Sequence, residues 1–108
     1  MEHGQPSWQR TPCPPWCVSV HREEDLAGDR IHRSQGFEEV LRARTGRVGA
    51  AGFQVASAPA EFAAGLSLAD GEETVWLYVG SGPRQQVEID VRDATRLLFL
   101  IGRALVDA

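Results

Sequence analysis

The sequence contains no lysine and no asparagine, so arginine supplies all 11 of its basic side chains, against 15 acidic ones. The formal net charge of −4 argues against a dedicated nucleic-acid-binding protein, because such proteins usually carry a basic excess. No apolar run reaches the ~18 residues that a transmembrane helix needs, and the N-terminus lacks the charged-then-apolar pattern of a secretory signal. We therefore expect a cytoplasmic protein with no membrane association and no nucleic-acid partner.

Cysteine is scarce as well. Two cysteines in 108 residues are too few for the disulfide scaffold of a small secreted protein. Hydrophobic residues make up 43% and charged residues 24% of the chain, which is close to the composition of an ordinary globular domain. A chain of this length forms a single domain.

The chain changes character near residue 36. The first 35 residues contain both cysteines, all three histidines, two of the three tryptophans and four of the six prolines. This segment has little aliphatic material and no regular hydrophobic period, so it cannot bury enough apolar area to offset its ordering entropy. Within the one domain we expect a flexible N-terminus over 1–10, a segment over 11–35 that something other than a core must hold, and a core over 36–108.

The hydrophobic pattern over 36–108 predicts an α+β fold, with a small, mostly antiparallel sheet of three to five strands and a C-terminal helix packed on it. Asp70-Gly71 is a hairpin signal. In the strand over 74–79, Trp76 and Tyr78 lie on one face and Val75, Leu77 and Val79 on the other, so both faces are apolar and both are expected to be covered. The expected strands cover 37–44, 52–57, 66–68, 74–79 and 87–91, and a glycine-rich connection covers 45–52.

The last element is predicted to be a helix over 91–106, with Asp90 as its N-cap. At about 100° per residue, one face of this helix is apolar and is expected to pack on the sheet. That face consists of Ala94, Leu97, Leu98, Ile101 and Leu105.

The residues that carry chemistry are Cys13, Cys17, His21 and His32, with the spacing Cys-x3-Cys-x3-His-x10-His. Two thiolates and two imidazoles satisfy the tetrahedral preference of zinc. If residues 15–21 are helical, Cys17 and His21 lie four apart on one helix face. We predict a zinc-binding segment over 11–35, whose bound ion supplies the stability that the segment lacks.

Other interpretations of this segment stay open. The two cysteines can form a disulfide or remain free thiols, and the His-x10-His spacing departs from that of standard zinc fingers. His32 is the weakest of the four assignments, and His3, Asp25 and Asp29 are substitutes for it as the fourth ligand.

Over residues 12–34 the chain resembles a family of short, uncharacterised actinobacterial proteins with a Cys-Pro-x-Trp-Cys-x3-His motif and a second histidine about ten residues later. The matching residues are Cys13-Pro14-Pro15-Trp16-Cys17, His21 and His32-Arg33-Ser34. The later part of that family resembles two or three strands followed by a C-terminal helix, which 75–80 and 87–108 fit. The resemblance implies a zinc ligand set and implies no particular activity.

A catalytic zinc site is the alternative to a structural one. His21-Arg22-Glu23 forms a His-x-Glu triplet of the kind that zinc deaminases use, but here the order relative to the cysteines is inverted and the cysteine spacing is longer. A catalytic zinc also keeps one position open for water, which requires that His32 does not bind. Glu23 or Glu24 would then be the general base.

The C-terminal helix carries five successive apolar residues, 97–101, so it is apolar on more than one side. Phe99 lies away from the predicted core face, and the arginines Arg92, Arg96 and Arg103 surround it. A second copy of the chain, a partner protein or the N-terminal segment can cover this surface, and Trp16 is a further candidate contact residue. The sequence thus favours a small zinc-binding protein that acts as a protein-interaction or regulatory module, with a zinc-dependent enzyme as the alternative.

Overall fold

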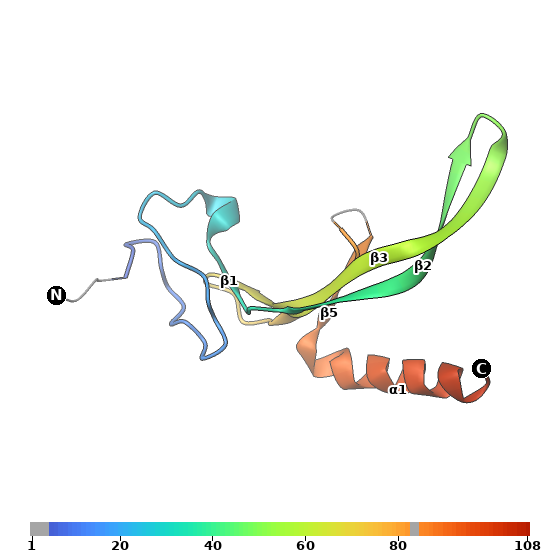
Figure 1. The fold of residues 1–108 in the computed structure, drawn as a ribbon. Coiled ribbons are helices and arrows are strands. Elements are labelled where there is room, and N and C mark those ends of the chain that lie inside the picture. Colours follow the sequence, from blue (N-terminus) through green and yellow to red (C-terminus); the bar gives the residue numbers. More distant parts are fainter. Residues whose placement is uncertain (1–4, 83–84) are drawn as a thin grey trace.

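The computed structural model describes residues 5–82 and 85–108, apart from the side chains of residues 45 and 47 (Figure 1). An N-terminal segment without regular structure leads into a sheet, and one α-helix follows the sheet. In chain order the elements are η1 (Ala27–Asp29), β1 (Ile31–Arg33), β2 (Phe37–Gly49), β3 (Gly52–Ala69), β4 (Trp76–Gly80), β5 (Gln86–Asp90), η2 (Val91–Asp93) and α1 (Ala94–Val106).

The sheet is antiparallel and built around β3, which is 18 residues long. The strand order is β1-β3-β4-β5, and β2 also pairs with β3. Along β3, residues 52–64 pair with β2, residues 67–69 pair with β1, and residues 63–67 pair with β4. The α+β class, the antiparallel sheet and the C-terminal helix are therefore confirmed.

The β2–β3 hairpin is longer than the sequence pattern predicts. The glycine-rich stretch over 45–49 was expected to be a connection, but it continues β2 in register with β3 as far as Gly49 opposite Gly52. A Cβ on Gly46 would meet the ring of Phe53, so this glycine makes room for an aromatic side chain that covers the strand. Gly52 has a φ of +100°, which glycine adopts at little cost and which turns the chain at the tip.

The two faces of the sheet differ in polarity. Residues directly opposite each other in antiparallel strands share a face, and successive residues alternate between the faces. The β2–β3 register therefore places Leu41, paired with Ala60, and Val40, paired with Glu61, on opposite faces of the sheet. The face that we call the apolar face carries the polar side chains of Glu39 and Gln54 and otherwise the apolar residues Phe37, Leu41, Ala43, Ala56, Ala58, Ala60, Phe62, Ala64, Leu66, Leu68, Leu77, Val79, Val87 and Ile89.

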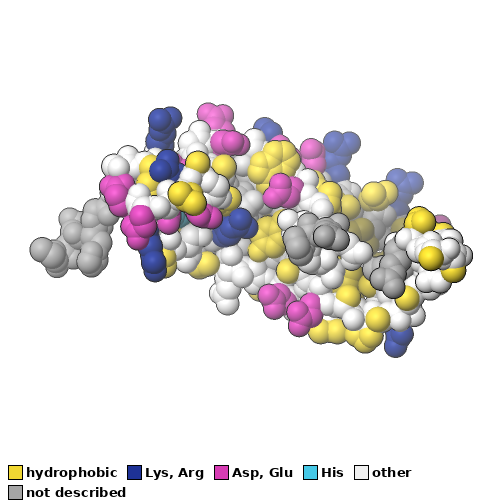
Figure 2. Space-filling view, turned by 90° about the horizontal axis from the view of Figure 1, so that it is seen from above, with side chains coloured by type: hydrophobic (Ala, Val, Ile, Leu, Met, Phe, Trp, Pro, Cys, Tyr) yellow, Lys and Arg dark blue, Asp and Glu magenta, His cyan; other side chains and the backbone are white. Residues whose placement is uncertain are grey.

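Little of this apolar material is buried. Among the residues that the structure describes, Leu68 is the one large hydrophobic side chain that is buried, with 5% of its surface exposed. The buried polar residues of the described chain are His32 and Ser67. Figure 2 shows hydrophobic side chains open to solvent along one side of the molecule, interspersed with acidic and basic ones. A core of this size is small for a chain of 108 residues.

The helix begins where the sequence indicates. The Asp90 carboxylate accepts a hydrogen bond from the Arg92 amide at 3.0 Å, and the first three residues form the 3₁₀ turn η2 before α1 starts. The face expected to pack on the sheet is largely open, however, because none of the residues of α1 is buried. Leu98, Ile101 and Leu105 are 69%, 47% and 66% exposed. Neither α1 nor the other described helical segments have the length and apolar character needed to cross a membrane.

Candidate metal site

The N-terminal segment has no regular secondary structure before η1, and its residues 18 and 19 lie beside β1. The Cys17 amide donates to the Pro14 carbonyl at 2.9 Å in a tight turn, and the Val18 amide then donates to the Arg33 carbonyl at 2.9 Å. The short helix that the spacing allowed over 15–21 does not form; Val18 and Ser19 instead form hydrogen bonds with Arg33 of β1. Cys17 and His21 thus converge through a stretch without regular secondary structure.

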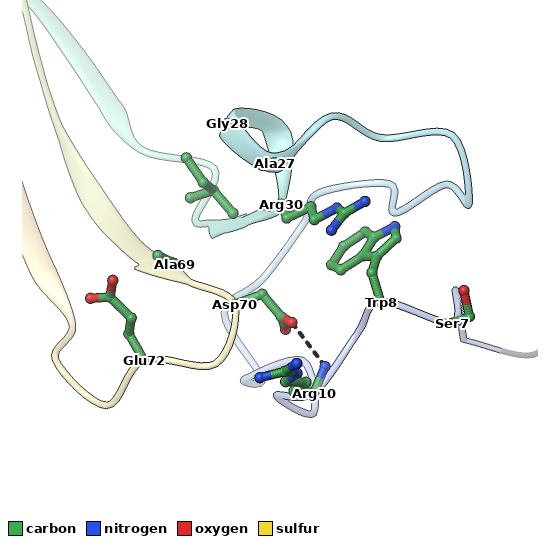
Figure 3. A pocket seen from close by; sticks show the side chains of 10 residues that line it. Ser7, Trp8, Arg10, Ala27, Gly28, Arg30, Ala69, Asp70 and Glu72 are labelled. Atoms are coloured by element: carbon green, nitrogen blue, oxygen red, sulfur yellow. Dashed lines mark hydrogen bonds between the residues drawn. The ribbon is translucent and has the colours of Figure 1, made fainter.

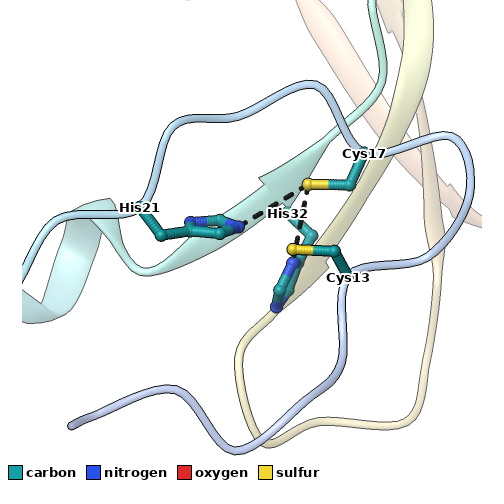
Figure 4. Close-up of side chains that lie close together, drawn as sticks. All are labelled: Cys13, Cys17, His21 and His32. Atoms are coloured by element: carbon teal, nitrogen blue, oxygen red, sulfur yellow. Dashed lines mark hydrogen bonds between the residues drawn. The ribbon is translucent and has the colours of Figure 1, made fainter. Parts of the chain in front are cut away.

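The four predicted ligands converge on one point (Figure 4). Cys13, Cys17 and His21 come from the N-terminal segment, and His32 comes from β1. Each residue offers one ligand atom, and these four atoms lie within 4.8 Å of one another. The sequence therefore identified a group of side chains that can hold a metal ion.

The distances within the cluster suit tetrahedral coordination. The Cys17 Sγ lies 3.6 Å from the Nε2 of His21 and 3.6 Å from the Nδ1 of His32. In a tetrahedral site with metal–sulfur bonds of about 2.3 Å and metal–nitrogen bonds of about 2.0–2.1 Å, sulfur and nitrogen ligands are about 3.6 Å apart. Both cysteines are free thiols rather than a disulfide.

His32 is held by a partner on its other side. Its side chain is fully buried, and its Nε2 lies 3.1 Å from the Oδ1 of Asp70, whose side chain is 6% exposed. An Nε2–H that donates to the carboxylate leaves Nδ1 unprotonated and directed at Cys17, which is the tautomer that a metal needs. In the β1–β3 register His32 lies opposite Leu68, and the last pair is Ile31 with Ala69. Asp70 is the next residue after this pair, which brings it close to His32.

Backbone amides fix Asp70 in turn. The amides of Arg10 and Thr11 donate to its two carboxylate oxygens at 2.8 and 3.0 Å. Burial acts to raise the pKa of Asp70, but these hydrogen bonds and the contact with His32 outweigh it and lower the pKa below its ordinary value. Asp70 is therefore a carboxylate at neutral pH, and it orients the imidazole as an anionic acceptor.

The second imidazole is neutral at pH 7. Burial lowers the pKa of His21 below its ordinary value, and the nearby His32 acts in the same direction. The Trp8 ring packs edge-on to His21 with centroids 5.5 Å apart. The ring offers Nε2 to the cluster, 3.6 Å from the Cys17 Sγ, and its Nδ1 is buried without a hydrogen-bond partner among the described residues.

The protonation of the thiols depends on whether a cation is bound beside them. Burial raises the pKa of the Cys13 thiol, the Gln9 side-chain amide opposes this rise, and the neighbouring Cys17 adds to it. The Gln9 Nε2 lies 3.4 Å from the Cys13 Sγ, where it stabilises a thiolate. A divalent cation at this point removes the mutual repulsion and holds both sulfurs as thiolates.

Residues before the first cysteine wrap the cluster. The Ser7 hydroxyl donates to a Glu23 oxygen at 2.6 Å, and the Trp8 indole donates to the Arg22 carbonyl at 2.7 Å. The Arg30 guanidinium lies over the Trp8 ring, 5.4 Å from its centroid. These side chains border an open pocket of about 570 Å³ on the outer side of Asp70 (Figure 3).

Of the substitutes for the fourth ligand, Asp25 and Asp29 do not belong to the cluster. Asp25 accepts a hydrogen bond from the Arg22 amide at 2.9 Å, Asp29 lies exposed in η1, and His3 is outside the described residues. The functional residue that the pattern did not indicate is Asp70. Asp70-Gly71 reads as a turn signal, and only the β1–β3 register reveals that this turn faces His32.

The predicted contact residues lie on two surfaces. Trp16 is half-buried and borders an apolar pocket of about 430 Å³ with Phe37, Leu66 and Leu77 on the apolar face. Phe99 is 69% exposed on α1, where it borders a shallow apolar groove together with Arg103.

Two of the arginines near Phe99 already have acidic partners. Arg92 pairs with Asp90 and Arg96 pairs with Asp93. The hydrogen bonds from Arg92 lower the pKa of Asp90 to about 2. This pairing, like the net negative charge, disfavours a role for these arginines in binding nucleic-acid phosphates.

Fold and site together define a small α+β protein with a Cys2His2 side-chain cluster that can hold a metal ion. The chain matches a family model described as a domain of unknown function, DUF6907, over residues 1–105, and it belongs to that family. No curated protein and no solved structure matches it.

Proposed function

We propose that this chain is a small zinc-binding protein in which a structural zinc ion fastens the N-terminal segment to the sheet, and that it acts as a protein-interaction or regulatory module. The observation that carries the proposal is the convergence of four ligand atoms, from Cys13, Cys17, His21 and His32, within 4.8 Å of one another.

The donor set favours zinc over other divalent cations. Thiolate and imidazole ligands select zinc rather than magnesium or calcium, which prefer oxygen ligands. Two thiolates also balance the charge of the cation, so binding leaves no excess charge beside the buried His32 and Asp70. The carboxylate–histidine–metal arrangement of Asp70 and His32 is the usual way in which proteins orient a zinc-bound imidazole.

A structural role follows from the shortage of other stabilising contacts. The N-terminal segment contributes no large buried hydrophobic residue to the described structure, so packing alone does not hold it. A structural zinc ion contributes about 10–16 kcal/mol of apparent binding free energy at neutral pH. That is comparable to the whole unfolding free energy of a typical domain.

The alternative is an enzyme with three protein ligands and a metal-bound water. It requires that His32 leave the metal, yet His32 is fully buried and is bonded to Asp70. It also requires a free general base nearby. Glu23, the acidic residue of the His-x-Glu triplet, accepts hydrogen bonds from the side chain and amide of Ser7, which lower its pKa. These contacts favour the structural role.

The interaction role rests on the exposed apolar surface. Phe99, Trp16 and the apolar groove on α1 offer contact area, and Arg103 borders the groove with a positive charge. Aromatic and arginine side chains are enriched at protein–protein interfaces. The surface is therefore suited to a protein partner.

The test is the metal content of the protein purified under reducing conditions from zinc-supplemented cells. We expect one zinc ion per chain by elemental analysis. Cys17→Ser should lose the zinc, because Cys17 contacts both imidazoles, and Asp29→Asn should keep it, because Asp29 is an exposed acidic residue outside the cluster. Protein without zinc, or a Cys17→Ser variant with full zinc content, would overturn the proposal.

A further inference from the structure

We propose that the protein is a homodimer, in which the apolar face of the β2–β3 hairpin and helix α1 of one copy pack against the same elements of the second copy. This names the partner for the interaction role proposed above. It rests on the exposed surfaces of the chain rather than on the metal cluster, so the two proposals can fail separately.

The first argument is the area that the single chain leaves exposed. A monomeric protein of 11.8 kDa has an accessible surface of about 5,900 Å² when folded, whereas this chain exposes 8883 Å². The excess is about 3,000 Å² per copy, and obligate homodimers bury about 2,000–5,000 Å² or more in total. The uncovered surface is thus as large as the interface of a stable dimer requires.

The second argument is the shape of the chain. Its radius of gyration is 18.0 Å, compared with about 13 Å for a compact domain of this length. The hairpin and α1 extend from the rest of the sheet in the same general direction (Figure 1), and both are largely uncovered. Phe37 and Leu41 on the hairpin are 83% and 51% exposed, and Leu105 on the helix is 66% exposed.

The third argument is the kind of surface that each element presents. A sheet with one apolar face is stable when a helix or a second sheet covers that face. A helix with an apolar side must likewise bury that side against another element. This chain contains both elements and leaves both open. A two-fold pairing covers them at once, because each copy supplies the surface that the other lacks.

A second copy also fits the requirement for a permanent partner. Leu68 is the one large hydrophobic residue buried within the described chain, so the cover is needed for folding and not only for signalling. A foreign protein would provide it only while bound. A second copy is present wherever the first one is made.

The experiment measures the mass of the zinc-supplemented full chain in solution by light scattering or sedimentation at micromolar concentration. We expect twice the mass of one chain. The variant Leu41→Arg places a charge on the apolar face, and the matched control Val40→Arg places the same charge on the opposite face, one residue away and 61% exposed in the single chain. Leu41→Arg should give a monomer or an unfolded chain, while Val40→Arg should stay dimeric.

The comparison of Leu41→Arg with Val40→Arg distinguishes a dimer from a monomer. In a monomer both side chains are exposed and both variants behave alike, so equal behaviour of the pair would overturn the proposal. A monomeric wild-type chain would overturn it as well and would leave the surface to a foreign partner. Zinc content measured on the same samples separates the two proposals: a zinc-loaded monomer refutes the dimer alone, and a zinc-free dimer refutes the metal site alone.

Discussion

A tight zinc chelator added under reducing conditions is expected to unfold residues 7–35 and to leave β2–β5 and α1 largely intact. All four ligands lie in this segment, His32 in β1 and the others before it, and its other links to β3 are hydrogen bonds such as that from the Ser34 amide to the Leu66 carbonyl. Surface hydrogen bonds of this kind contribute about 1 kcal/mol each, against about 10–16 kcal/mol for structural zinc. The segment therefore loses most of its stability with the metal.

Hydrogen exchange measured along the chain checks this expectation. Amides over 7–35 should exchange at the rates of an unfolded chain after chelation, whereas amides in the β3–β4 ladder should stay protected. Addition of excess zinc should restore the original protection, which controls for damage by the chelator. Unchanged exchange over 7–35 in metal-free protein would show that the segment is held without zinc.

The substitution His32→Ala is expected to have the second large effect, a loss of zinc affinity of more than 100-fold. The change removes one of the four ligand atoms and also the hydrogen-bond partner of a carboxylate that is 6% exposed. A buried charge without its partner costs several kcal/mol. Zinc titration against a competing chelator measures the affinity, and Asp29→Asn, at an exposed acidic position, serves as the control with wild-type affinity.

Asp70→Asn provides the graded comparison for that experiment. The asparagine keeps the shape of the side chain but removes its charge, and its amide group must face a backbone amide, because both carboxylate oxygens accept such bonds from Arg10 and Thr11. Loss of an outer-shell partner weakens metal binding by about 10–100-fold. Wild-type affinity in Asp70→Asn, or an effect as large as that of His32→Ala, would contradict the roles assigned to the two residues.

The ligand cluster could be predicted from the sequence because its signal is local. Cys13, Cys17 and His21 lie at short, regular spacings in a segment that has no other means of becoming ordered. The ligands meet without the helix that the spacing allowed over 15–21, because residues 15 and 16 form a turn and residues 17–21 have no regular secondary structure. Asp70 could not be predicted, because only the pairing of β1 with β3 brings it to His32.

The strands of the core were predicted where hydrophobic residues alternate, and the hairpin was underestimated where glycines interrupt that pattern. Gly46 and Gly49 read as a loop, yet the ladder between β2 and β3 continues through them. The cover of α1 was not predictable for a different reason. Its apolar face is plain in the sequence, but a hydrophobic pattern shows that a face needs cover and not which chain provides it.

The central claim is that four protein side chains complete the coordination of one zinc ion. X-ray absorption at the zinc edge of the purified protein tests it most directly. The account predicts two sulfur ligands at about 2.3 Å and two nitrogen ligands at about 2.0–2.1 Å, with no bound water. A shell of two sulfurs, one nitrogen and one oxygen would contradict it, because that shell leaves His32 unbound and opens the metal for catalysis.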